Sequence, residues 1–327
     1  MSKAAQYLAG LTVVAALAES LVELRMRIDP WRLAALVASA ALVVGAMVAL
    51  TEGAFVRRLR HWAGNSRLVA AGLPFLLLPP YLIYGAGTGT WSALALGKLV
   101  AYIAVPVLLL LPPAARAHPR FGWRDAAALV ALAVPVAAGW LANVWTWPLD
   151  LYFFGPVFCL VTGGYAFMVL RGLEGVGFRL VWRRADLTDG LANLAAFALV
   201  AIPLGVALGF LHPHHAAPNL SPVAPPLLFV GIYLTVAIPE EFVFRGVLQN
   251  LLAQTIRRGP PGFYALAIAS VVFGASHLHH APVPNWRYAI MATLAGAFYG
   301  NVYRSRRRLC ACALTHALVD TVWHYWL

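Results

Sequence analysis

The stretch from residue 227 to residue 253 reads LLFVGIYLTVAIPEEFVFRGVLQNLLA, a long apolar run that holds two adjacent glutamates and one arginine. It is longer than the ~20 residues that a helix needs to cross the hydrocarbon core of a bilayer. An ionisable residue inside a membrane helix is costly, so it requires a partner or a function. The stretch therefore predicts a transmembrane helix with polar chemistry at its centre.

Apolar runs of comparable kind recur along the whole chain. Of its 327 residues 61% are hydrophobic and only 11% are charged, against roughly 25% charged residues in soluble domains. The runs are continuous rather than alternating, which argues against a transmembrane β-barrel. We expect an all-α, polytopic transmembrane helix bundle with about ten to eleven membrane segments. The runs cover residues 4–22, 33–50, 68–84, 91–111, 126–142, 149–170, 191–211, 227–253, 263–276, 288–303 and 309–327.

The net charge of +12 comes from arginines that gather in alternate loops. The loops 85–91, 143–150, 212–222 and 278–287 between them carry only Arg287. By the positive-inside rule the basic loops face the cytoplasm, and lipid rather than nucleic acid is the expected partner. We expect an integral protein of a bacterial inner (plasma) membrane. The arginines at positions 25, 27 and 32 break this pattern, so either the first run lies in the interface or the topology differs at this end.

The central stretch offers one paired and one unpaired carboxylate. Glu241 and Arg245 are four residues apart, so in a helix they share a face in the favourable order. Glu240 points about 100° away and is not paired by that arginine. Glu240 is therefore a candidate general base. The alternative is a purely structural Glu–Arg pair that joins two helices.

Two further motifs lie in later membrane segments. Phe273 and His277 end one apolar run, and His316 and Asp320 lie four residues apart in the last. Glu240 precedes Arg258 by 18 residues and His277 follows it by 19, so in a helical hairpin the two reach similar depth. Asp320 lies only 12 residues beyond Arg308. At ~1.5 Å per residue it would therefore lie ~10 Å nearer the basic side of the membrane than Glu240 and His277 do. Two histidines and three carboxylates in three segments predict a functional polar cluster.

These three motifs, EExxxR, FxxxH and HxxxD, resemble those of the CAAX-processing and bacteriocin-processing (CPBP) family. Its members are intramembrane endopeptidases, to which the eukaryotic CAAX prenyl endopeptidase is related. The resemblance covers about residues 170–327. It implies a CPBP-like protease domain there, whereas residues 1–169 form N-terminal transmembrane helices of unassigned role.

The resemblance also implies roles for the motif residues. Glu240 and His277 would activate the attacking water, and His316 and Asp320 would stabilise the oxyanion. Glu241 and Arg245 would hold the helix in place. The best-studied branch has Asn at the position of Asp320, and an ionised carboxylate cannot donate a hydrogen bond. Two roles therefore stay open for Asp320, which are orienting His316 and donating as a protonated acid.

The expected function is hydrolysis of a peptide bond in a membrane-associated protein or a leader peptide. A zinc site needs three protein ligands and a water, and the chain lacks the HExxH spacing. We expect no obligatory metal, with a metalloprotease that uses zinc or another divalent cation as the alternative. Two other functions stay open. One is a transporter that uses Glu240, His277 and His316 as a proton relay, and the other is a catalytically silent membrane partner or immunity protein.

Overall fold

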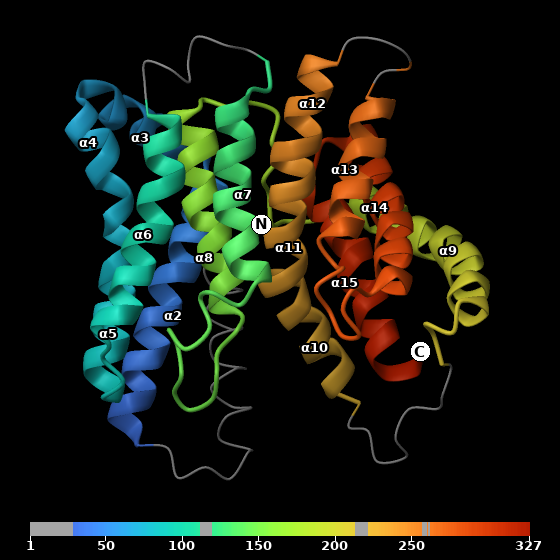
Figure 1. Ribbon diagram of the computed structural model, residues 1–327, viewed down its shortest axis with the longest axis horizontal. Coiled ribbons are helices and arrows are strands. Elements are labelled where there is room, and N and C mark those ends of the chain that lie inside the picture. The colour runs from blue at the N-terminus through green and yellow to red at the C-terminus, as the bar shows by residue number, and fades with distance from the viewer. Residues whose placement is uncertain (1–28, 112–119, 213–221, 257–259, 261) are drawn as a thin grey trace. The chain divides into compact units, whose positions relative to one another are not determined.

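The computed structural model of the protein describes residues 29–111, 120–212, 222–256, 260 and 262–327. Every regular element in this part of the chain is a helix (Figure 1), so the expected all-α class is confirmed. The chain divides into two compact units. The first contains residues 122–174 and most of the chain before them, and the second contains residues 175–327 with the short segment 119–121.

The first unit is held together by helix packing and by two arginines at one end. Arg60 donates to the carbonyl oxygen of Met168 at 2.7 Å, and Arg171 pairs with the buried carboxylate of Asp125 at 2.8 Å. These bonds connect α3 (Gly53–Asn65) and α7 (Trp123–Ala137) to the end of η2 (Gly164–Leu170). The helices are α2 (Pro30–Leu50), α3 (Gly53–Asn65), α4 (Arg67–Gly72), η1 (Leu73–Leu77), α5 (Leu78–Thr88), α6 (Ala93–Leu110), α7 (Trp123–Ala137), α8 (Phe154–Gly163) and η2 (Gly164–Leu170).

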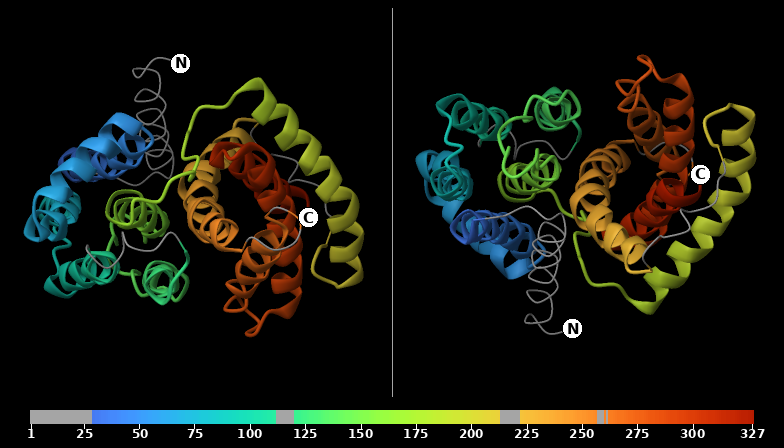
Figure 2. Two further views of the ribbon diagram at one scale, coloured as in Figure 1. Left: turned by 90° about the horizontal axis from the view of Figure 1, so that it is seen from above. Right: turned by 90° about the horizontal axis from the view of Figure 1, so that it is seen from below.

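The second unit is built around one continuous helix that spans Ala224–Thr255. The helix α9 (Arg184–Ala207) runs along the outside of α14 (Trp286–Arg306) and α15 (Leu309–Trp326) (Figure 2). The elements are α9 (Arg184–Ala207), α10 (Ala224–Ile232), η3 (Tyr233–Ala237), α11 (Ile238–Glu241), η4 (Phe242–Gln249), α12 (Asn250–Thr255), α13 (Phe263–Ala275), α14 (Trp286–Arg306) and α15 (Leu309–Trp326).

Five helices of the described chain are long and apolar enough to cross a membrane. Two shorter apolar helices, Phe154–Leu170 and Phe263–Ala275, accompany them. The expected ten to eleven segments are not confirmed and stay a prediction. The helix α15 is not among the five, and its sequence contains His316, Asp320 and His324, whose polar side chains lower its mean hydropathy. The candidate spans are Pro30–Leu50, Arg67–Thr88, Ala93–Leu110, Arg184–Ala207 and Ala224–Thr255.

Some boundaries differ from those expected. The segment expected to be a basic loop around residues 51–67 contains the helix α3, whose apolar Val56 and Ala63 are buried beside exposed arginines. This helix was missed because its arginines dominate the hydropathy of the segment. The helix α9 begins at Arg184 rather than near residue 191, because the Asp186 carboxylate accepts a hydrogen bond from the Arg183 backbone at 2.7 Å. The first apolar run, 4–22, lies outside the described residues.

Helices α13 and α14 approach each other closely through glycines. A Cβ placed on Gly274 would lie 2.5 Å from the backbone oxygen of Ala289. Gly300 likewise leaves no room for a side chain beside Gln249 and Leu266. Small residues allow helix backbones to come near one another in membranes. This contact fixes the end of α13, two residues before His277, against α14.

Candidate active site

The two glutamates lie on a single α-helical turn between two π-helical segments. Tyr233–Ala237 precedes the turn and Phe242–Gln249 follows it. Pro239 occupies the first turn of α11, where its missing N–H and its ring would disturb a regular helix. Wider π turns are rare and occur often at functional sites. The sequence therefore produces an irregular helix at the place where it carries both carboxylates.

Glu241 is the buried centre of the ion pairs. Its carboxylate lies 3.1 Å from Nε of Arg245, and the two side chains are 0% and 1% exposed. This confirms the pair expected from the spacing. Arg245 also donates to the carbonyl oxygen of Gly296 at 3.2 Å, and its guanidinium lies 4.4 Å from the ring centre of Phe273. Glu241 and Arg245 thereby connect the central helix to α13 and α14.

The second partner of Glu241 was not expected from the sequence. Nδ1 of His316 lies 2.9 Å from Oε1 of Glu241. On the other side of the imidazole, Nε2 lies 3.4 Å from Oδ2 of Asp320 and 3.9 Å from Oε2 of Glu240. His316 is buried and lies among three carboxylates. The expected proximity of Asp320 to His316 is confirmed. The two glutamates of α11 also lie beside the imidazole.

The expected ~10 Å depth gap between Asp320 and the other members is wrong. The start of α15 is embedded in the unit rather than lying at its edge. The backbone N–H of Leu309 donates to the carbonyl oxygen of Gly177 at 3.0 Å, and Arg308 donates to the carbonyl oxygen of Val181 at 2.7 Å. The segment 175–183 therefore covers this turn, and α15 begins deeper than a simple hairpin would place it.

His277 is oriented by the residue that shares its motif. Its Nδ1 lies 2.8 Å from the carbonyl oxygen of Phe273, and a carbonyl can only accept. Nδ1 therefore carries the proton, which leaves Nε2 to accept or exchange one. The Phe273 ring also meets the His277 ring edge-on, at 4.8 Å between centroids. The FxxxH spacing thus serves both orientation and packing.

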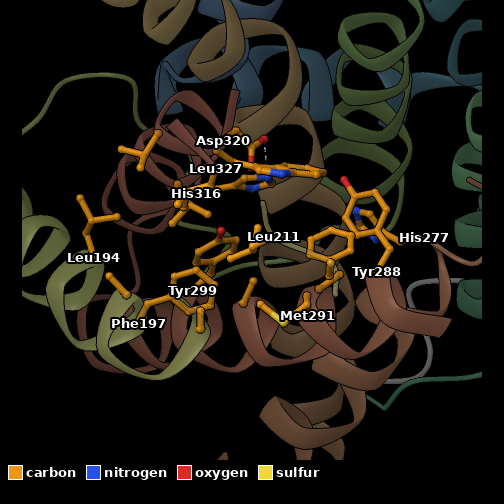
Figure 3. Close-up of a pocket in the computed structure, with 18 of the residues that line it drawn as sticks. Leu194, Phe197, Leu211, His277, Tyr288, Met291, Tyr299, His316, Asp320 and Leu327 are labelled. Atoms are coloured by element: carbon orange, nitrogen blue, oxygen red, sulfur yellow. Dashed lines mark ion pairs between the residues drawn. The ribbon is translucent and has the colours of Figure 1, made fainter. Parts of the chain in front are cut away.

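The four expected site residues line one cavity of about 270 Å³ (Figure 3). Glu240, His277, His316 and Asp320 reach it from α11, the end of α13 and α15, and most of the remaining lining is apolar. Oε2 of Glu240 is buried and has no hydrogen-bond partner among the described residues. No hydrogen bond joins Glu240 directly to His277 in this part of the chain, and a water takes up only about 30 Å³. The cavity that both residues line therefore has room for water.

A second hollow leads from this cavity to the loop between α13 and α14. It has a volume of about 600 Å³ and shares Phe210, His280, Tyr288 and Trp323 with the inner cavity. Burial lowers the pKa of His280, and the neighbouring His279 lowers it further, so His280 is neutral near pH 7. The described loop 276–285 contains no arginine and belongs to the loops that lack the arginine clusters.

The donor set does not match a metal centre. Among the described residues, no group of three or more His, Cys, Asp or Glu side chains is arranged to hold a metal ion. Nδ1 of His316 contacts Glu241, and Nδ1 of His277 contacts a carbonyl oxygen. We therefore derive no step through a metal, and the expectation of no obligatory metal stays a prediction.

Sequence reasoning missed two tyrosines of the cavity. Tyr288 lies with its ring centre 4.6 Å from that of His277, and Tyr299 stacks on His316 at 4.8 Å. Both come from α14, which contributes no residue to the three motifs. Their spacing of 11 residues, close to three helical turns, is the only signal that places them on one face.

Comparison with known proteins adds one finding. Neither the curated proteins nor the solved structures include a match to this chain. Residues 222–322 match the family model of the type II CAAX prenyl endopeptidases described as Rce1-like. This region contains all three motifs and most of the cavity lining. Residues 222–322 are therefore similar to the Rce1-like type II CAAX prenyl endopeptidases, which agrees with the resemblance of the three motifs to the CPBP family.

Proposed function

We propose that the protein hydrolyses a peptide bond of a membrane-associated polypeptide or leader peptide, with a water activated by Glu240 and His277. The observation that carries the proposal is Oε2 of Glu240, which is buried, has no hydrogen-bond partner among the described residues and belongs to a side chain that lines the cavity with His277. Buried polar atoms are nearly always satisfied. The Glu240 side chain as a whole is 32% exposed, so a water in the cavity can reach its carboxylate and give up a proton to it.

In this reaction Glu240 accepts a proton from the water, whose oxygen attacks the scissile carbonyl carbon. The C–N bond then breaks, and the proton passes to the leaving amine. Nε2 of His277 is the free ring nitrogen that can accept a hydrogen bond from the same water. A base placed within hydrogen-bond reach contributes typically 10²–10⁴-fold in rate.

His316 supplies positive charge on the other side of the reacting group. It lies between the carboxylates of Glu241 and Asp320, at 2.9 Å and 3.4 Å. We assign Asp320 to the orientation of His316, since an ionised carboxylate cannot donate to an oxyanion. Glu241 and Arg245 hold His316 and the central helix in place.

We further propose that residues 170–327 form the protease domain, in the inner membrane of a bacterium. Residues 1–169 form a separate membrane region to which no role is assigned. The matched family is named for prenylated CAAX substrates, and this chain would act on a polypeptide that reaches the cavity from the membrane. The proposed reaction needs no obligatory metal.

The test is a comparison of the proteomes of cells that carry the wild-type protein or Glu240→Gln. We expect at least one membrane-associated polypeptide to accumulate as a longer precursor only in the variant. Glu52→Gln, which changes a glutamate of the first unit, is the matched control and should leave the proteome unchanged. Equal processing in both strains, or a pH-dependent ion flux without any processing, would favour the transporter.

A further inference from the structure

The proposed reaction lacks an obvious hydrogen-bond donor for the oxyanion of its tetrahedral intermediate. His316 has both ring nitrogens close to carboxylates, at 2.9 Å from Glu241 and 3.4 Å from Asp320. Asp320 itself only accepts when ionised. The N–H groups of His316 are therefore directed at carboxylates, and the oxyanion needs a further hydrogen-bond donor besides the charge of His316. Preorganised donors of this kind contribute a large part of the rate in acyl-transfer enzymes.

Tyr299 has the properties that this role needs. Tyr299 is 1% exposed and lines the cavity. Its hydroxyl makes no hydrogen bond within the described residues, and it is not one of the fully enclosed polar atoms that lack a partner, so the hydroxyl is open to the cavity. An unpaired hydroxyl at the wall of the cavity is available to donate to a group that binds there during the reaction.

The ring of Tyr299 is also fixed in place. It stacks on the imidazole of His316 at 4.8 Å with an interplanar angle of 17°, and Phe197 and Phe273 contact it from two other helices. Figure 3 shows Tyr299 on the same side of the cavity as His316, with Tyr288 beside His277. Tyr299 therefore lies beside His316 and away from His277.

We propose that Tyr299 is a further catalytic residue, whose hydroxyl donates a hydrogen bond to the oxyanion of the tetrahedral intermediate. This inference rests on the proposed peptide hydrolysis. The phenol keeps its proton throughout. The attacking water forms the new O–C bond, the carbonyl oxygen takes up the negative charge, and the hydrogen bond from Tyr299 stabilises that charge until the C–N bond breaks.

The test compares Tyr299→Phe with the wild type in the hydrolysis of two probes. These are a farnesylated, internally quenched CAAX peptide and a peptide of the precursor that accumulates with Glu240→Gln. The substitution keeps the stacked ring and removes only the oxygen. Loss of one oxyanion donor costs roughly 10²–10³-fold in kcat, so we expect a drop of about 100-fold in kcat with KM nearly unchanged.

Tyr303→Phe is the matched control on the same helix. The hydroxyl of Tyr303 donates to the backbone of Gly175 at 2.7 Å, away from the cavity. Its removal should lower the melting temperature and leave kcat within about twofold, whereas Tyr299→Phe should melt like the wild type. The reverse pattern, or a larger drop of kcat for Tyr288→Phe than for Tyr299→Phe, would overturn the assignment.

Repeating the Tyr299→Phe substitution in an Asp320→Asn variant separates an effect on catalysis from an effect on packing. Asp320→Asn introduces an amide that can donate to the same oxyanion. The loss caused by Tyr299→Phe should therefore shrink from about 100-fold to less than tenfold when it is combined with Asp320→Asn. An equal loss of kcat with Asp320 and with Asn at this position would contradict the claim that Tyr299 and residue 320 contact the same oxyanion. A wild-type protein that cleaves neither probe would instead contradict the proposed function, and the inference with it.

Discussion

The replacement Glu241→Ala tests the arrangement of charges beneath the cavity. Glu241 is fully buried and faces two positively charged or donating groups, Arg245 at 3.1 Å and His316 at 2.9 Å. Removal of one partner from a buried ion pair typically costs about 3–5 kcal/mol, because the other charge stays buried without compensation. The folded-to-unfolded ratio should therefore fall by about two to three and a half powers of ten.

The structure also predicts an order among variants. In Arg245→Met the carboxylate of Glu241 keeps His316 as its partner, so this variant should lose less stability than Glu241→Ala. The control is Asp189→Ala, which removes an ion pair with Arg306 at the exposed surface. Exposed pairs contribute little, so this variant should unfold like the wild type.

The assay is unfolding by SDS in mixed detergent micelles, followed by far-ultraviolet circular dichroism and tryptophan fluorescence. We expect the midpoint to fall in the order wild type, Arg245→Met, Glu241→Ala. A Glu241→Ala midpoint equal to that of Asp189→Ala would refute the claim that the pair is buried and shared with His316.

Three further predictions concern packing, topology and metal use. Gly274→Ala should destabilise the protein by roughly 1–3 kcal/mol, because the new Cβ meets the backbone of α14; Gly231→Ala, with no atom within 4 Å of its added Cβ, should not. A cysteine at Pro284, after replacement of the native cysteines, should react with a membrane-impermeant thiol reagent on intact cells; labelling only after permeabilisation would invert the topology. Dialysis against EDTA should leave peptide hydrolysis within about twofold, and loss of activity that zinc restores would show a required metal.

The class of fold follows from the sequence because most of the membrane helices coincide with continuous apolar runs. The boundaries of α10 to α12 agree closely with the run 227–253, since no polar segment interrupts the helix Ala224–Thr255. Hydropathy fails where polar residues lie on a helix, as with the arginines of α3 and the site residues of α15. The number of membrane segments is the part of the fold that the helix lengths leave open.

The candidate site could be predicted in its members but not in its contacts. The spacing of four residues is enough to join Glu241 to Arg245 and His316 to Asp320. The bond between Glu241 and His316 depends on how deeply α15 begins, which is determined by the covering segment 175–183. No periodic pattern in the sequence encodes that depth. The tyrosines of α14 were missed for the same reason, since they join the site only through tertiary packing.

Cleavage by the purified protein in liposomes tests the central claim most directly. The substrate is the precursor that accumulates in cells with Glu240→Gln, and the product is identified by mass spectrometry. We predict that the wild type cleaves it at one peptide bond, whereas Glu240→Ala and His277→Ala insert, unfold at the wild-type midpoint and yield no product. Cleavage by either variant at the wild-type rate would contradict the account of a water activated by Glu240 and His277.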